Sequence, residues 1–167
     1  GGELGKKWHN AGRLKEKQNV FDDFLYASKY LEANNIGNRK STVISGRSNG
    51  GLLVGTSLVQ NPNYFGATLP AVGVLDMLRF TEFTEGWGWR GDYGSPLLSK
   101  KDFDFNFEIS PYHQLKEGEC YSPTLITTGR RDDRVVPSHS YKFTARIQEF
   151  QGCNNPAMLI DTVRAGH

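Results

Sequence analysis

The sequence has little net charge, few sulfur-containing residues and no long hydrophobic run. Its 20 Lys and Arg residues nearly balance its 18 Asp and Glu residues, which leaves a formal net charge of +2. Because charges of both signs are interspersed, nothing indicates a nucleic acid or a membrane surface as a partner. No apolar stretch approaches the roughly 20 residues that a membrane-spanning helix needs. What remains is a chain of 167 residues, which is the size of one domain.

The chain has only two cysteines, Cys120 and Cys153, and they lie far apart in the sequence. They form neither a metal-binding spacing nor a disulfide framework, so we interpret both as structural or surface thiols. No other cluster of ligand-forming residues stands out. We therefore expect no metal and no cofactor, and we expect a cytoplasmic protein.

One stretch organises the rest of the chain. Residues 43–54 read Val-Ile-Ser-Gly-Arg-Ser-Asn-Gly-Gly-Leu-Leu-Val, an apolar run, a glycine-bounded serine and a second apolar run. The Gly-x-Ser-x-Gly pattern between a strand and a helix is typical of a nucleophile elbow, which would present the hydroxyl of Ser48. Gly46 and Gly50 would allow close backbone approach, because neither carries a Cβ. The alternative is an ordinary glycine-rich turn with an exposed serine.

Helical and strand patterns alternate along the chain, which is typical of a parallel α/β sheet. We predict helices over residues 19–35 (with Asn19 as N-cap), after the elbow, and from Pro137 to near Gly152. We predict strands over residues 42–45, 67–72, 125–128 and 158–160. Residues 1–18 are predicted to form a loop, residues 100–108 a surface segment, and Ser110-Pro111 a turn.

The segment of residues 73–94 fits neither a helical nor a strand period. Aromatic residues alternate there with glycines, including Trp87, Trp89 and Tyr93. Such a segment suits a loop that forms the wall of a binding pocket. The same rings could instead fill a core under a long connection, and the pattern alone does not decide between the two.

A serine nucleophile requires a general base, usually a histidine, within hydrogen-bond reach. On α/β-hydrolase scaffolds the chain order is serine, acid, histidine. His9 precedes Ser48, His113 precedes the best acids, and His139 lies within the predicted helix that follows them. His167 lies in the loop after the last predicted strand, so elimination favours it as the base.

The acid that orients the base is expected in a loop beyond a strand. Asp132 and Asp133 directly follow the strand predicted at residues 125–128. Either could complete a catalytic triad, and either could be a solvated turn charge beside the neighbouring arginines. Spacing does not choose between these roles.

Three separated motifs together resemble the peptidase domain of the prolyl oligopeptidase family. They are Gly-Arg-Ser-Asn-Gly-Gly at 46–51, Asp-Asp-Arg-Val-Val-Pro at 132–137 and Ala-Gly-His at 165–167. Shorter similarities at residues 1–5, 8–9, 18–24 and 154–156 extend the resemblance over essentially the whole chain. It implies an α/β-hydrolase fold with a mostly parallel sheet flanked by helices.

The resemblance implies a serine endopeptidase that hydrolyses short peptides on the carboxyl side of proline through an acyl-enzyme. By position, Ser48 matches the nucleophile, Asp132 the triad acid and His167 the general base. Asn49 matches the residue whose backbone N–H forms half of the oxyanion hole. Removing one such donor typically costs about 10²–10³ in rate.

The resemblance also implies a substrate pocket. Arg134 matches an arginine that hydrogen-bonds a substrate carbonyl beyond the proline, a task that suits its fork of donors. Trp89 matches a tryptophan that stacks on the proline ring, and Tyr93, Val74 and Val135 match other walls. Proline is a flat apolar ring, so an aromatic surface selects it by shape and contact area. This favours a pocket wall for the segment 73–94.

Arg47 departs from the family pattern, which most often has glycine there. Members that cut after basic residues carry arginine at this position, so an oligopeptidase with basic specificity is the alternative. Asn49, Trp89 and the motif at 132–137 favour prolyl specificity.

Several family features lie outside the sequence. They are a tyrosine that completes the oxyanion hole, the early strands of the sheet, the β-propeller and a helix after the general base. We therefore expect residues 1–167 to be a fragment of a single α/β-hydrolase peptidase domain. Its expected partners are a short proline-containing peptide and the rest of its own chain. We expect poor stability in isolation, because unpaired strand edges would be exposed. An incomplete fragment or a degenerate homologue that only binds remains the non-catalytic alternative.

Overall fold

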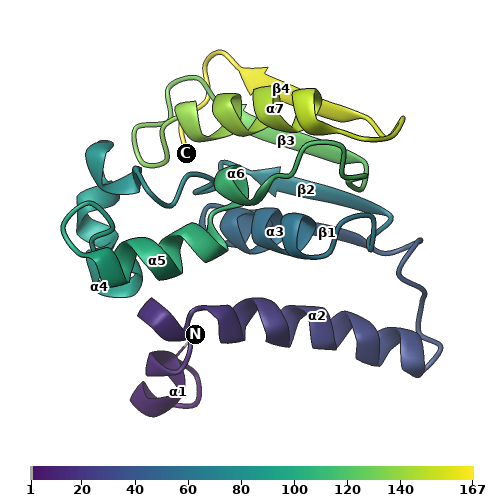
Figure 1. The fold of residues 1–167 in the computed structure, drawn as a ribbon, viewed down its shortest axis with the longest axis horizontal. Coiled ribbons are helices and arrows are strands. Elements are labelled where there is room, and N and C mark those ends of the chain that lie inside the picture. The colour runs from purple at the N-terminus through teal and green to yellow at the C-terminus, as the bar shows by residue number, and fades with distance from the viewer. Residues whose placement is uncertain (1) are drawn as a thin grey trace.

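Four parallel strands form the centre of the protein, which the computed structural model describes over residues 2–167 (Figure 1). The strands are β1 (Val43–Arg47), β2 (Ala67–Ala71), β3 (Thr124–Gly129) and β4 (Ala157–Thr162). They lie in the order β1-β2-β3-β4, and every neighbouring pair is parallel. The parallel α/β sheet that the sequence predicts is thus confirmed, and all four strands end at the same edge.

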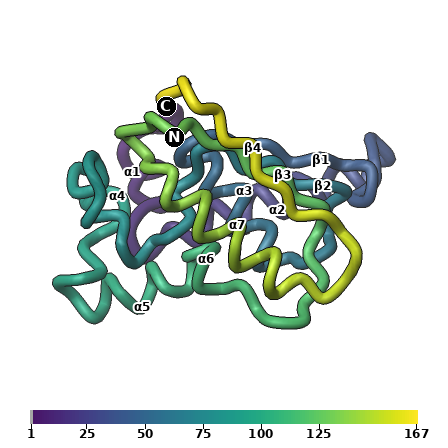
Figure 2. The backbone as a smooth tube through the Cα atoms, turned by 90° about the horizontal axis from the view of Figure 1, so that it is seen from above, coloured from purple at the N-terminus to yellow at the C-terminus, as the bar shows by residue number. Residues whose placement is uncertain are grey.

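Two long helices cover one face of this sheet (Figures 1 and 2). Helix α3 (Asn49–Gln60) packs against β1 and β2, and helix α7 (Ser138–Phe150) packs against β3 and β4. The short helix α6 (Pro111–Gln114) contacts both. Leu58 of α3 and Phe143 of α7 are fully buried in one apolar cluster between the helices and the sheet. This burial stabilises the layered arrangement.

Helix α2 (Gln18–Ala33) forms an outer layer against α3. Its predicted N-cap is wrong: Lys17 precedes the helix, and the Asn19 side chain instead donates a hydrogen bond to the Ala11 carbonyl at 2.8 Å. Residues before it are more ordered than the predicted loop, since they contain α1 (Lys6–Asn10) and the 3₁₀ helix η1 (Leu14–Glu16). Gly1 lies outside the described residues.

The long connection between β2 and β3 consists of short helices. They are the 3₁₀ helices η2 (Phe80–Glu82) and η3 (Gly86–Trp89), then α4 (Arg90–Tyr93), α5 (Lys100–Ile109) and α6. The surface segment predicted at residues 100–108 is in fact helix α5. The Ser99 hydroxyl caps it by accepting a hydrogen bond from the Asp102 N–H, and Asn106 and Ile109 are buried on its inner face.

The other face of the sheet is apolar and largely open. Val43 of β1 and Met158 and Ile160 of β4 are each at least half exposed there. Leu125 of β3 pairs in register with Met158, so it belongs to the same face. Parallel sheets are almost always covered on both faces. Among residues 2–167, no helix is long and apolar enough to cross a membrane.

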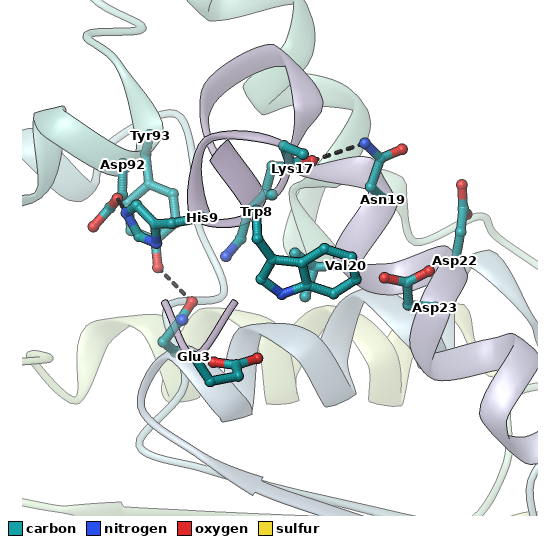
Figure 3. Close-up of a pocket in the computed structure, with 13 residues that line it drawn as sticks. Glu3, Trp8, His9, Lys17, Asn19, Val20, Asp22, Asp23, Asp92 and Tyr93 are labelled. Carbon is teal, nitrogen blue, oxygen red and sulfur yellow. Dashed lines mark hydrogen bonds and ion pairs between the residues drawn. The ribbon is translucent and has the colours of Figure 1, made fainter. Parts of the chain in front are cut away.

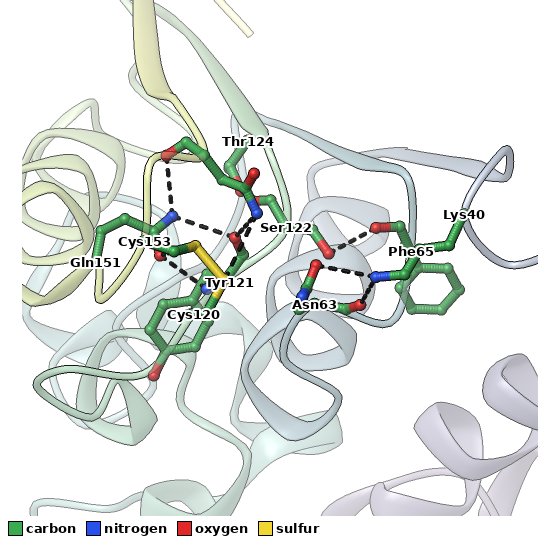
Figure 4. Close-up of a disulfide and its surroundings, with 10 residues drawn as sticks. Lys40, Asn63, Phe65, Cys120, Tyr121, Ser122, Thr124, Gln151 and Cys153 are labelled. Carbon is green, nitrogen blue, oxygen red and sulfur yellow. Dashed lines mark hydrogen bonds between the residues drawn. A yellow bond between two sulfur atoms is a disulfide. The ribbon is translucent and has the colours of Figure 1, made fainter.

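The two cysteines form a disulfide at the amino end of the sheet (Figure 4), which corrects their assignment as thiols. Cys120 lies just before β3 and Cys153 just before β4, with their Cα atoms 5.1 Å apart. Because β3 and β4 are neighbours, residues 33 positions apart in sequence meet at this edge. Sequence spacing gave no sign of this pairing because the strand order sets it.

Candidate active site

The predicted catalytic residues follow three strands of the sheet at their carboxyl ends. Ser48 follows β1, Asp132 follows β3, and His167 follows β4. Parallel strands end at one edge, and crevices beyond that edge are where open α/β sheets bind their ligands. The topology therefore gathers these residues on one side of the protein.

Ser48 occupies a strained turn between β1 and α3. Its backbone has φ +59° and ψ −117°, a left-handed region that residues with a side chain rarely adopt. Two backbone hydrogen bonds of Ser48 hold the turn. The Ser48 N–H donates to the Ala71 carbonyl at 2.9 Å, and the Ser48 carbonyl accepts from the Leu52 N–H at 3.1 Å. Such strain costs about 1–3 kcal/mol and persists only where the surroundings enforce it.

Glycines make this turn possible, although only one of the two that the sequence indicated is required. A Cβ on Gly46 would lie 2.1 Å from the Gly50 carbonyl oxygen, whereas a Cβ on Gly50 would meet nothing within 4 Å. The second close approach occurs at Gly51, where a Cβ would lie 2.6 Å from the Cα of Gly73. The tight packing of the elbow thus depends on Gly46 and Gly51.

A second strained residue lies beside the elbow. Val72 has φ +42° at the end of β2, an outlier for a β-branched residue, and its N–H donates to the Thr127 carbonyl at 2.8 Å. It directly follows Ala71, whose carbonyl holds Ser48. Two neighbouring strands therefore both end in strained backbone, a feature that clusters at functional sites.

Asp132 and His167 form a hydrogen-bonded pair. The Nδ1 atom of His167 lies 2.8 Å from Oδ2 of Asp132, and the carboxylate is buried while the imidazole is partly exposed. The other carboxylate oxygen accepts the N–H groups of Arg134 at 3.0 Å and Val135 at 2.9 Å. Asp133 is exposed, and the carboxylate paired with His167 is that of Asp132. The geometry thus pairs His167 with Asp132, the acid that the resemblance named and that spacing alone did not choose.

The loop that carries His167 is fixed to the end of β3. The Arg131 N–H donates to the Ala165 carbonyl at 3.0 Å, and the Asp132 N–H donates to the Gly129 carbonyl at 3.0 Å. A Cβ on Gly129 would lie 2.5 Å from the Gly166 carbonyl oxygen. A glycine at 129 is therefore needed for the acid and the histidine to approach each other.

Ser48 and His167 do not form a hydrogen bond to each other within the part of the chain that the structure describes. Catalytic hydrogen bonds in unliganded enzymes are often long and tighten when substrate binds. The structure brings together the acid and the base, and it places the serine at the same edge of the sheet.

The predicted pocket wall assembles as one apolar cluster. Val74, Tyr93 and Val135 are buried in it, and Trp89 packs against it half-buried. Phe80, another aromatic residue of the segment 73–94, stacks under Trp89 with ring centroids 6.3 Å apart. The rings of Phe80 and Tyr93 therefore fill a core, and the Trp89 ring lies on it and is partly exposed. Trp87 is exposed.

Two further predicted residues differ in how they are held. The guanidinium of Arg134 is exposed and has no side-chain partner among residues 2–167. The Asn49 side chain is held firmly, because its Oδ1 accepts a hydrogen bond of 2.5 Å from the Tyr93 hydroxyl. Sequence patterns could not reveal this bond, which joins residues 44 positions apart.

A buried polar network supports the wall from behind. The carboxylate of Asp76 accepts hydrogen bonds from the N–H groups of Leu78 and Arg79 and forms an ion pair with Lys142. Burial alone would raise the pKa of Asp76, but the hydrogen bond and charge of Lys142 outweigh it and hold the pKa below its usual range. No sequence pattern indicates this network, because its members come from separate segments, residues 76–79 and helix α7.

The network also contains a buried histidine, His139 of α7. Its Nδ1 accepts the Asp76 N–H at 3.0 Å, and its ring packs edge-on against Phe83. Burial lowers the pKa of His139 to about 4, so the ring is neutral at physiological pH. Burial likewise lowers the pKa of His113. His139 is fully buried, and Nδ1 of His113 lies 2.8 Å from the buried Ser110 hydroxyl, so both rings are engaged in this network rather than at the open edge where His167 lies.

A pocket of about 660 Å³ lies beside Asn49 and Tyr93 (Figure 3). Its walls come from the first 23 residues and from α4. Four acidic residues line it, together with the buried Lys17 and with His9, which lies 3.6 Å from a carboxylate oxygen of Asp92. The acidic lining residues are Glu3, Asp22, Asp23 and Asp92. In residues 2–167 no cluster of His, Cys, Asp and Glu is arranged to hold a metal ion.

Comparison with known proteins places the whole chain in one family. The model of the prolyl oligopeptidase family matches residues 1–167. The prolyl endopeptidase of Elizabethkingia miricola is 48% identical over 167 residues, which is 100% of this chain and 24% of that protein. The prolyl endopeptidase of Dictyostelium discoideum is 45% identical over 170 residues, covering 100% of this chain and 22% of that protein.

Solved structures agree with these matches. A prolyl endopeptidase structure superposes with a TM-score of 0.94 at 47% identity, covering 97% of this chain and 24% of that one. Prolyl oligopeptidase B of Galerina marginata, bound to a 35mer hydrolysis and macrocyclization substrate, gives a TM-score of 0.93 at 41% identity over 98% of this chain and 23% of that one. The chain spans about a quarter of the length of these relatives. Its parallel sheet and flanking helices are those of an α/β hydrolase, and the chain belongs to the prolyl oligopeptidase family.

Proposed function

We propose that residues 1–167 carry the catalytic residues of a serine endopeptidase that cleaves short peptides on the carboxyl side of proline. Ser48 attacks the scissile carbonyl, His167 takes the hydroxyl proton and later gives it to the leaving amine, and Asp132 orients the imidazole. The product of the first step is an acyl-enzyme on Ser48, which water then hydrolyses. No cofactor takes part in these steps.

The hydrogen bond between Asp132 and His167 is the observation that carries this proposal. It joins a buried acid to a partly exposed histidine at the same edge of the sheet as a serine in a strained turn. The acid is itself fixed by two backbone N–H groups, so the imidazole has one preferred orientation. We assign the backbone N–H of Asn49 as one oxyanion donor, because Asn49 is the first residue of α3 and the first N–H groups of a helix have no partner within it.

The proposed substrate preference follows from the apolar cluster. The partly exposed ring of Trp89 offers a flat surface, backed by Phe80, on which a proline ring can stack. The free guanidinium of Arg134 is available for a substrate carbonyl. Several relatives are named prolyl endopeptidases.

A second candidate is cleavage after basic residues. Arg47 is its sequence signal, and the four carboxylates that line the pocket beside Asn49 would attract a cationic side chain. The two candidates differ in where the substrate side chain binds. A proline ring would bind at the apolar cluster that contains Tyr93, and a basic side chain would bind in the acidic pocket that Tyr93 also lines.

We also propose that other segments of a longer protein cover the open face of the sheet. The relatives are about four times as long as this chain, and Val43, Met158 and Ile160 form an exposed apolar face that parallel sheets normally bury. A β-propeller and further sheet strands are the expected partners. That residues 1–167 are part of one larger peptidase domain stays a prediction.

The cytoplasmic location expected from the sequence also stays a prediction. The disulfide between Cys120 and Cys153 weighs against it, because disulfides persist mainly in oxidising compartments. Fractionation of cells, followed by measurement of whether both cysteines are free thiols or disulfide-bonded, distinguishes the cytoplasm from an oxidising compartment.

A screen of reporter peptides tests the proposed activity. The full-length protein is assayed with otherwise identical peptides that place Pro, Arg or Ala before the reporter, and Ser48→Ala is the control. Prolyl specificity predicts hydrolysis of the Pro peptide that Ser48→Ala abolishes. Hydrolysis of the Arg peptide alone supports the second candidate, and equal activity of Ser48→Ala contradicts both.

A further inference from the structure

We propose that the Tyr93 hydroxyl is a positioning group for the oxyanion hole. By holding the side chain of Asn49, it fixes the direction of the Asn49 backbone N–H. This inference rests on the proposed function, since it takes Ser48 as the nucleophile. It adds a role for Tyr93 besides that of a pocket wall.

The bond lies next to the nucleophile. The Tyr93 hydroxyl donates to Oδ1 of Asn49 at 2.5 Å, and Asn49 is the first residue of α3, directly after the strained Ser48. The first N–H groups of a helix have no partner within it. The peptide that carries the Asn49 N–H is anchored on one side only, through the Ser48 carbonyl, which accepts from the Leu52 N–H at 3.1 Å, so it needs a second constraint at Asn49 itself to resist tilting. A hydrogen bond to the side chain of the same residue supplies that constraint.

Tyr93 is itself held rigidly enough to act as a support. Its side chain is buried, and Phe80 packs against it edge-on at 5.5 Å. The Asn106 side chain donates a hydrogen bond of 2.6 Å to the Tyr93 carbonyl. On the pocket side, the ammonium of Lys17 lies 5.5 Å from the centre of the ring, and Figure 3 shows both residues lining that pocket. Such a cation over an aromatic face is attractive.

The hydroxyl remains a donor over the whole working pH range. Burial and, to a smaller extent, the neighbouring Asp92 raise the pKa of Tyr93 far above its usual value. The group therefore keeps its proton, and the Asn49 oxygen is its acceptor.

One side chain thus connects two parts of the site. The Tyr93 ring belongs to the apolar cluster that also contains Val74 and Val135, while its hydroxyl holds Asn49. A substrate side chain that displaced the Tyr93 ring from this cluster would also move the oxyanion donor, the Asn49 N–H. Substrate selection and transition-state stabilisation are coupled through this residue.

Steady-state kinetics of the full-length protein test the inference with three variants. Tyr93→Phe keeps the ring and removes the hydroxyl, Asn49→Ala keeps the backbone N–H and removes the acceptor, and the third variant combines both changes. We expect each single variant to lower kcat for the prolyl reporter by about three- to tenfold, the range that one neutral hydrogen bond supports, with KM nearly unchanged. We expect the double variant to lose no more than either single one, because all three lack the same bond.

A pair of inhibitors separates positioning from wall contact. A peptide ending in prolinal forms a hemiacetal: the Ser48 oxygen adds to the aldehyde carbon, the serine proton passes to His167, and the carbonyl oxygen becomes the oxyanion. The matching prolinol peptide has no carbonyl to attack. Tyr93→Phe should weaken binding of the aldehyde by the same factor as kcat and leave binding of the alcohol unchanged. Tyr26→Phe, an exposed tyrosine on α2, is the matched control and should change neither.

Each outcome decides between the inference and its alternatives. Unchanged kcat in Tyr93→Phe, a rise in KM alone, equal weakening of both inhibitors, or additive losses in the double variant would overturn the positioning role. Activity that survives Ser48→Ala overturns the proposed function instead. If a thermal melt shows that Tyr93→Phe is unfolded, the aldehyde-to-alcohol affinity ratio of Asn49→Ala decides the question.

Discussion

The two ends of the parallel sheet differ in how they are stabilised. At the carboxyl end, Ser48 and Val72 have strained backbones, and an acid, a histidine and an apolar cluster converge. At the amino end, the disulfide between Cys120 and Cys153 joins the segments that enter β3 and β4. Two of the five non-glycine residues with positive φ among residues 2–167, Ser48 and Val72, lie where chemistry is proposed, and the covalent link lies away from it.

The difference indicates a division between function and stability. The hydrogen bonds of the amino end, such as that from the Tyr121 N–H to the side-chain oxygen of Gln151 at 2.8 Å, close loops around the disulfide (Figure 4). The hydrogen bonds of the carboxyl end, such as those between Asp132 and His167 and between Tyr93 and Asn49, hold side chains of the proposed site in place. Changes at the carboxyl end should therefore alter rates, and changes at the amino end should alter the free energy of unfolding.

The largest effect is expected for Asp132→Asn in the full-length protein. The substitution removes the charge that orients and stabilises the imidazole, so kcat should fall by about 10³–10⁴-fold while the melting temperature changes little. Asp133→Asn is the matched control, because this neighbour is exposed and His167 pairs with Asp132 instead. Steady-state kinetics and thermal melts measure both. Equal losses in the two variants would contradict the assignment of the acid.

Removal of the disulfide by the double substitution Cys120→Ser and Cys153→Ser should lower the free energy of unfolding rather than the reaction rate. A cross-link that closes a loop of 33 residues contributes about 4 kcal/mol to the free energy of unfolding in the chain-entropy account. The bridge is about 20 Å from the carboxyl edge by the length of β3, so kcat should not change. Guanidinium unfolding checks the first expectation.

A reductant supplies the control for this comparison. It should destabilise the wild-type protein by the same amount and have no effect on the double serine variant. A variant with wild-type stability, or one with an altered kcat, would contradict the division between the two ends.

The carboxyl end should also be the acid-sensitive one. Because burial depresses the pKa of His139 to about 4 from an unfolded value near 6.5, the unfolded chain binds the extra proton first as pH falls. The contribution, about 3 kcal/mol, is fully present above pH 6.5 and is lost as pH falls toward 4. The depressed pKa of His113 acts in the same direction, and Asp76 and Lys142 face both rings.

Unfolding at a series of pH values measures this slope. His139→Asn removes the titrating group, so its free energy of unfolding should vary less between pH 6.5 and 4 than that of the wild type. Identical slopes in the two proteins would show that the pH dependence arises elsewhere.

A smaller effect than that of Asp132→Asn is expected for Trp89 in the pocket wall. Trp89→Ala removes the surface on which proline is proposed to stack and should lower kcat/KM for the prolyl reporter by about 10- to 100-fold, mainly through KM. Trp87→Ala, two residues away and exposed, should have no effect. If the two variants behave alike, Trp89 does not form the wall.

The sequence predicted the sheet and the elbow because both depend on local patterns. Both can be recognised in the sequence itself, from the apolar runs, the glycines around Ser48 and Pro137 before α7. Helix α5 was missed because its Phe and charged residues suggested a surface segment, and the helix is evident only from its Ser99 cap and the buried Asn106.

The contacts that define the site depend on strand order and could not be predicted from spacing. Spacing alone did not choose between Asp132 and Asp133; the family resemblance named Asp132, and the order of β3 and β4 places His167 beside it. The disulfide was missed for the same reason. The bond between Tyr93 and Asn49 requires α4 to return to the start of α3, which no periodicity encodes.

The most direct test of the proposed catalytic site is covalent labelling of the full-length protein with a fluorophosphonate probe, followed by peptide mass spectrometry. The probe reacts with a serine that a neighbouring base activates. The arrangement of Asp132, His167 and the strained elbow predicts a single labelled residue, Ser48, with labelling abolished in Ser48→Ala and strongly slowed in His167→Ala. Labelling of another serine, or undiminished labelling of Ser48→Ala, would contradict it.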